Sequence, residues 1–142
     1  MASSPSLTLK RRLKVPPEKV YEAWTQPAQM MRWWGGNNEA TRTAETDLRV
    51  GGHFHVGFKG DTGEQHDVSG VYKEIVPNRR LVFSWAWRTT PERESQVTID
   101  IRPDTGGSIL TLTHEQFFNE KARDDHSRGW TAALDNLEKI YG

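Results

Sequence analysis

The chain has 142 residues, no cysteine, and 19 Lys and Arg residues balanced by 19 Asp and Glu residues. The balanced charge gives no general attraction to nucleic acid, and the lack of cysteine excludes disulfides, thiolate metal sites and cysteine nucleophiles. The length suits one ordinary domain, so we expect residues 1–142 to form a single domain.

Neither a targeting signal nor a membrane anchor is predicted. Met1 to Leu9 lacks a charged segment followed by an apolar one, the pattern of a secretory signal. No apolar run approaches the roughly 20 residues that a membrane-spanning helix needs. We therefore expect a cytoplasmic protein. Its six tryptophans and five phenylalanines must then line a core or a cavity.

The N-terminal part predicts one strand and two short helices. Residues 7–13 form the first strand, which ends before Pro16-Pro17. Apolar residues then recur at helical spacing in two runs, separated by Pro27 and closed by Gly35-Gly36. Helices this short are marginal in water by themselves, so packing must hold them.

From about Thr43 the hydrophobic period changes to two, which is typical of half-buried strands. The alternating sets lie at residues 54–58, 66–76, 81–88, 97–101 and 110–114. Strands that follow one another through short turns predict an antiparallel sheet with one apolar face.

The register of the first hairpin follows from burial. Pairing Phe58 with His66 places Val56 opposite Val68, so that the apolar side chains share one face. A slip of one residue would mix polar and apolar side chains on both faces.

In the next hairpin, the register that suits the apolar residues brings one charged residue onto the apolar face. Pairing Val76 with Leu81 places Tyr72 opposite Trp85 and brings Glu74 onto the apolar face. An unpaired buried carboxylate is strongly destabilising. We therefore favour a β-bulge that turns Glu74 outward, over a carboxylate in the interior.

From Asn119 onward the period becomes 3.6, which predicts a long amphipathic helix with Trp130 on its apolar stripe. Asn119 is a suitable N-cap, and Glu120 is favourable in the first turn. This helix is the natural cover for the apolar face of the sheet. The expected fold is α+β: a curved antiparallel sheet of about six or seven strands wrapped around a long C-terminal helix, with two short helices after the first strand.

The interior wall supplies the candidate ligand-binding residues. They are Trp34, Phe54, Val56, Phe58, Tyr72, Phe83, Trp85, Trp87, Leu112, His114, His126, Trp130 and Leu134. For any one of these residues, a filled core is the more common explanation. A curved sheet closing on one helix is also a setting for an apolar ligand cavity.

The histidines offer two further sites to consider. His53 and His55 form an H-x-H pair, but His66 lies on the other face of the hairpin, and zinc needs three or four convergent ligands. We therefore predict no metal site. His114 and His126 face the interior, where they serve either in structural hydrogen bonds or, with Tyr72 or Glu74, in proton transfer.

Several segments resemble one protein family, the activator of heat-shock-protein-90 ATPase homologues. They are residues 15–24, 47–54, 70–77, 81–85 and 112–115, and Gly129-Trp130 with Leu134 and Leu137. They occur in the family's order along nearly the whole chain. The resemblance implies the birch-pollen-allergen-like, START-related helix-grip fold.

The leading hypothesis is a non-enzymatic carrier or sensor that holds a small apolar ligand, lipid-like or aromatic, between the sheet and the helix. The resemblance adds a chaperone-interacting module that contacts a heat-shock-protein-90-type partner. The third alternative is a cyclase or hydrolase that uses His114, with Glu74 or His126, for proton transfer. We predict no cofactor and no nucleic-acid partner, and a homodimer stays open.

Overall fold

One antiparallel sheet organises the fold of this computed structural model, which describes residues 5–34, 41–59 and 64–142. Its strands are β1 (Leu7–Leu13), β2 (Thr41–Thr46), β3 (His53–Lys59), β4 (Gln65–Val76), β5 (Arg80–Trp87), β6 (Ser95–Asp104) and β7 (Gly107–Glu115). The seven strands follow the order β1-β7-β6-β5-β4-β3-β2. Strands β2 to β7 thus form a meander, and β1 is added at the far edge beside β7.

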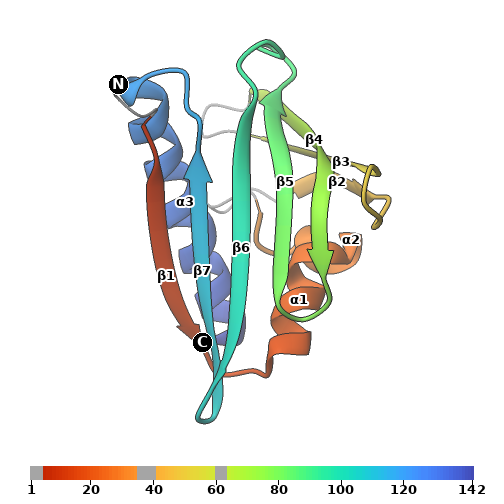
Figure 1. Cartoon of the computed structure of the whole chain (residues 1–142), viewed down its shortest axis with the longest axis vertical. Coiled ribbons are helices and arrows are strands. Elements are labelled where there is room, and N and C mark those ends of the chain that lie inside the picture. Colours follow the sequence, from red (N-terminus) through yellow and green to blue (C-terminus); the bar gives the residue numbers. More distant parts are fainter. Residues whose placement is uncertain (1–4, 35–40, 60–63) are drawn as a thin grey trace.

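Three helices accompany the sheet: α1 (Pro17–Thr25), α2 (Pro27–Met30) and α3 (Glu120–Tyr141). Figure 1 shows α3 lying across one face of the sheet, with α1 and α2 on the same side near one end. This confirms the predicted α+β architecture and the two short helices after the first strand. Gly35-Gly36, predicted to end the second helix, lies outside the described residues. No helix in the described part of the chain is long and apolar enough to cross a membrane.

The long helix has the ends that its sequence predicts. The side chain of Asn119 accepts a hydrogen bond from the backbone N–H of Ala122 at 2.8 Å, which satisfies one of the free donors at a helix start. Glu120 and Lys139 complement the helix dipole at its two ends. The apolar stripe buries Trp130, Ala133, Leu134 and Leu137 against the sheet.

The predicted register of the first hairpin is confirmed. Phe58 pairs with His66 and Val56 with Val68. Within this pairing, Gly70 lies opposite Phe54 and at a close approach between β4 and β5, because a Cβ atom there would lie 1.8 Å from the backbone oxygen of Ser84.

The predicted register of the second hairpin is wrong, by one residue beside the turn and by two beyond Glu74, where Tyr72 pairs with Phe83 instead of Trp85. Val76 pairs with Arg80 rather than with Leu81. The turn explains the difference, because Asn78 adopts a positive φ of 64° and closes a loop of three residues. A loop of this length needs one residue in the left-handed region, which asparagine tolerates well.

The β-bulge that we expected in β4 is present. The register shifts between Tyr72, which pairs with Phe83, and Glu74, which pairs with Val82. The Glu74 side chain consequently leaves the apolar face and lies 3.3 Å from the guanidinium of Arg80. The bulge removes the buried carboxylate and keeps Tyr72 inside.

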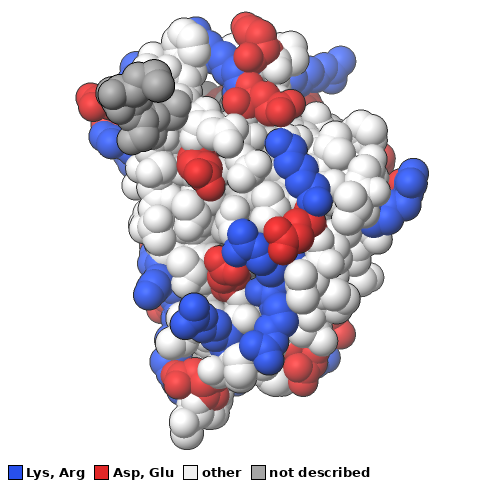
Figure 2. Space-filling view, viewed as in Figure 1, with Lys and Arg blue, Asp and Glu red and all other residues white. Residues whose placement is uncertain are grey.

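The face of the sheet that points away from α3 carries charged side chains. Arg80 also contacts Asp100 at 2.9 Å, and Arg12 contacts Asp104 at 2.9 Å. Figure 2 shows basic and acidic side chains interspersed over this face. One face of the sheet is therefore solvated, and the other supplies the core.

Candidate ligand-binding site

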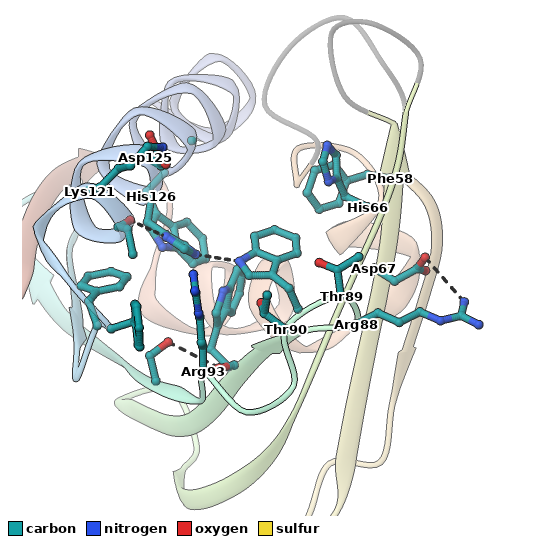
Figure 3. A pocket seen from close by; sticks show the side chains of 18 of the residues that line it. Phe58, His66, Asp67, Arg88, Thr89, Thr90, Arg93, Lys121, Asp125 and His126 are labelled. Carbon is teal, nitrogen blue, oxygen red and sulfur yellow. Dashed lines mark hydrogen bonds and ion pairs between the residues drawn. The ribbon is translucent and has the colours of Figure 1, made fainter.

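A cavity of about 760 Å³ lies between the N-terminal half of α3 and the end of the sheet that carries the β5–β6 loop. This volume falls within the range of roughly 300–1,000 Å³ that is usual for small-molecule sites. Figure 3 shows α3 on one side of the cavity and Phe58 and His66, from the β3–β4 hairpin, on the other. The long helix and the curved sheet therefore close on each other along only part of their length.

Aromatic side chains form the floor and one wall of the cavity. Trp85 and Trp130 lie with ring centroids 5.0 Å apart, and Trp34 stacks on Trp85 at 5.9 Å. Phe58 contacts Trp87 edge-on at 6.0 Å. Such rings offer a large apolar contact area with little conformational freedom to lose on binding.

Both ring nitrogens of His126 take part in hydrogen bonds. The indole N–H of Trp87 donates to Nε2 of His126 at 2.8 Å, and Nδ1 of His126 lies 2.7 Å from the carbonyl oxygen of Ala122. Because an indole nitrogen only donates, Nε2 must be the unprotonated nitrogen, and Nδ1 donates to the carbonyl. Burial lowers the pKa of His126, although the Ala122 hydrogen bond and the charge of Asp125 oppose this.

His114 is held in the opposite tautomer, deeper in the core. The indole N–H of Trp130 donates to Nδ1 of His114 at 2.9 Å, so Nε2 carries the proton and donates to Oγ of Ser95 at 2.7 Å. The Ser95 hydroxyl in turn donates to the carbonyl oxygen of Trp85 at 3.4 Å. Burial, with a smaller effect of nearby His126, lowers the pKa of His114 well below its usual value.

Comparison with known proteins places these features in a family. The model of the family described as "Activator of Hsp90 ATPase homolog 1-like protein" matches residues 14–142. The chain belongs to this family. No curated protein matches the sequence of this AHSA1-like chain.

Solved structures share the fold along nearly the whole chain. Protein CV1439 from Chromobacterium violaceum is 26% identical, with 96% of each chain covered and a TM-score of 0.86. The AHSA1 protein from Silicibacter pomeroyi is 25% identical, with 96% of each chain covered and a TM-score of 0.83. CalU16 from Micromonospora echinospora is 28% identical over 94% of this chain and 74% of its own, with a TM-score of 0.73.

The structure of the AHSA1-like chain divides the candidate ligand-binding residues into two groups. Trp34, Phe58, Trp85, Trp87, His126 and Trp130 line the cavity. Phe54, Val56, Tyr72, Phe83, Leu112, His114 and Leu134 are buried in the core and do not line it. All of them share the inner face, but α1 and the C-terminal half of α3 fill most of the space along that face.

The cavity also has lining residues that the sequence analysis did not predict to bind a ligand. They are Gln65, His66, Asp67, Arg88, Thr89, Thr90, Arg93, Ser95, Phe117, Phe118, Asn119, Lys121, Ala122, Asp125, Gly129 and Ala133. Three small residues on α3 could have indicated the cavity from the sequence. Ala122, Gly129 and Ala133 occur at helical spacing beside His126, where a filled core would need larger side chains.

Both histidines of the AHSA1-like interior take part in hydrogen bonds through both ring nitrogens. Ser95 and His114 resemble a nucleophile and its base, but a base must present an unprotonated nitrogen to the hydroxyl. Here Nε2 of His114 donates to Ser95, and Nδ1 is occupied by Trp130. Glu74, the other candidate for proton transfer, lies outside on the charged face.

The H-x-H pair lies apart from the cavity. His53 is exposed, and Nε2 of His55 lies 2.9 Å from a carboxylate oxygen of Asp67. Within residues 5–34, 41–59 and 64–142, no three His, Asp or Glu side chains gather in a way that would hold a metal ion.

Gly129 keeps one wall of the cavity open. It lies in the middle of α3, and a Cβ atom built on it would have no neighbour within 4 Å. A glycine in a helix interior costs about 1 kcal/mol relative to alanine. No close packing in the structure requires that glycine, whereas any larger side chain would project into the cavity.

Proposed function

We propose that this AHSA1-like domain binds and carries a small, mainly apolar ligand, aromatic or lipid-like, in the cavity beside α3. The observation that carries the proposal is a cavity of about 760 Å³ with a wall of tryptophans, kept open by Gly129. The occupied nitrogens of His114 and His126 favour binding over catalysis. The chaperone-interacting alternative rests on the family's description alone.

Filling the cavity tests the proposal. The neutral fluorescent probe N-phenyl-1-naphthylamine should bind the wild-type chain with a rise in fluorescence, because the tryptophan wall excludes water from the bound ring. Gly129→Phe should abolish this binding, since the new ring occupies the cavity without a clash at its Cβ atom.

Gly129→Ala is the matched control. It adds one methyl group, so it should keep probe binding while raising the free energy of unfolding by about 1 kcal/mol through helix propensity. Circular dichroism should show that both variants fold. Equal probe affinity in wild type and Gly129→Phe, or no binding by the wild type, would contradict the proposed function.

A further inference from the structure

Arg93 places a cation at the cavity, and no carboxylate among the described residues pairs with it. It lies on the β5–β6 loop, and its guanidinium carbon is 4.0 Å from the centroid of the Phe118 ring. In the described part of the chain its side-chain N–H groups make no hydrogen bond or ion pair. A guanidinium that stacks on a ring keeps its donors in its own plane, where they are available to an acceptor.

The other charged groups around the cavity are already paired. Asp67 contacts His55 at 2.9 Å and Arg88 at 4.0 Å. Lys121 contacts Asp125 at 2.9 Å. Figure 3 shows Arg88 directed away from the cavity, whereas Arg93 extends toward His126.

The charged side chains that line the cavity determine the sign of the charge that a ligand would meet. Among the described lining residues, three are cations, Arg88, Arg93 and Lys121, and two are carboxylates, Asp67 and Asp125. The indole N–H of Trp87 holds His126, a half-buried residue of the lining, in a neutral tautomer. The charges of Arg88 and Asp67 and those of Lys121 and Asp125 offset each other, so the lining that the structure describes keeps one positive charge, that of Arg93.

We propose that the ligand is a monoanion, an aromatic or aliphatic carboxylic acid, whose carboxylate is bound by Arg93 while its apolar part lies against Trp85 and Trp87. This inference rests on the proposed function and adds the chemical class of the ligand. A planar carboxylate fits the two parallel donors of a guanidinium. A dianion would exceed the single net charge and meet the carboxylates of Asp67 and Asp125.

The test compares two probes of nearly the same shape, 2-naphthoate and the neutral 2-naphthamide. Isothermal titration calorimetry should show that the wild-type chain binds the carboxylate at least about tenfold more tightly than the amide, because hydrogen bonds to charged groups are the stronger ones. The preference should shrink at high salt.

Substitution assigns this preference to one side chain. Arg93→Gln should bind 2-naphthoate and 2-naphthamide about equally, with amide affinity unchanged, and Arg93→Lys should keep part of the preference. The matched control is Arg102→Gln, which removes an exposed arginine on β6 outside the cavity and should bind both probes like the wild type. Thermal unfolding checks that each variant is folded.

The outcomes separate the two proposals. Equal affinity of the wild type for both probes, or an undiminished preference in Arg93→Gln, overturns the monoanion and leaves the apolar site standing. A wild-type chain that binds neither naphthalene probe nor N-phenyl-1-naphthylamine overturns the proposed function and this inference with it.

Discussion

At the scale of single residues, the two tryptophan–histidine pairs make the fold sensitive to acid. In each pair an indole N–H donates to an unprotonated imidazole nitrogen. Protonation of His114 in the core, or of His126 at the cavity, would leave an imidazole N–H pointing at an indole N–H, so that two donors face each other. Burial lowers the pKa of both rings for the same reason, since it penalises the charged form.

The sign of the pH dependence follows from these lowered pKa values. Above about pH 6.5 both the folded and unfolded states hold neutral histidines. Below it the unfolded chain binds protons that the folded chain refuses, so stability falls with decreasing pH, by at most about 1.4 kcal/mol per histidine per pH unit. Urea unfolding at about pH 7 and about pH 5.5 should therefore show a clear loss of stability at the lower pH.

Two substitutions identify the source of that loss. His114→Gln should flatten the dependence, because an amide can accept from Trp130 and donate to Ser95 without titrating. His53→Gln, on the exposed face of β3, should retain the full dependence. The lowered pKa values of Asp104 and Asp125 act only nearer pH 4. A wild-type stability that does not change between the two pH values would show that the rings are not held neutral.

At the scale of elements, the start of α3 serves both stability and the cavity. Asn119 caps the helix and also lines the cavity. Asn119→Ala should lower the free energy of unfolding by about 1 kcal/mol, because it frees the backbone N–H of Ala122. The measurement is the urea midpoint at unchanged m-value. Asn119→Asp keeps an acceptor oxygen at this position and should restore most of the stability, whereas equal losses in both variants would show that the cap contributes nothing.

The local sequence predicted most of the helices and strands. It did not predict the register of a hairpin whose pairing depends on the geometry of its loop. The apolar periods of β3 and of α3 located both elements, because burial leaves only one acceptable face for Val56 or Leu134. The outward turn of Glu74 was predictable from the free-energy cost of a buried carboxylate. The pairing of Val76 with Arg80 was not, since it depends on a left-handed Asn78 that several residue types can adopt.

The sequence could not predict the cavity itself, and the reason is a different one. An alternating pattern identifies the side of the sheet that Phe54 and Trp85 share, but not whether the space in front of each is filled. Phe54 is covered by core side chains and Trp85 borders the cavity, although both are nearly fully buried. Arg93 and Phe118 lie in loops without periodicity, where nothing in the sequence marks them as neighbours.

At the scale of the whole molecule, a bound ligand should stabilise the fold. A ligand that binds only the folded state at a hundred times its dissociation constant adds about 2.7 kcal/mol to the free energy of unfolding. N-phenyl-1-naphthylamine at that excess should therefore raise the thermal midpoint of the wild type by several degrees. The midpoint of Gly129→Phe should not move. An equal rise in both proteins would place the probe outside the cavity.

The position of β1 beside β7 has a consequence for how the chain folds. Residue 7 pairs with residue 114, and the backbone N–H of Lys14 donates to the carbonyl oxygen of Tyr141 at 2.7 Å. The first strand therefore cannot pair with β7 until residues 108–114 have been synthesised, because Leu13 pairs with Ser108 and Leu7 with His114. Such distant contacts are slow to form, and an emerging chain would display β1 unpaired, with Leu7, Leu9 and Leu13 uncovered, throughout that interval. This topology is therefore most vulnerable during folding, when aggregation competes with the pairing of β1, and less so in the stability of the folded state.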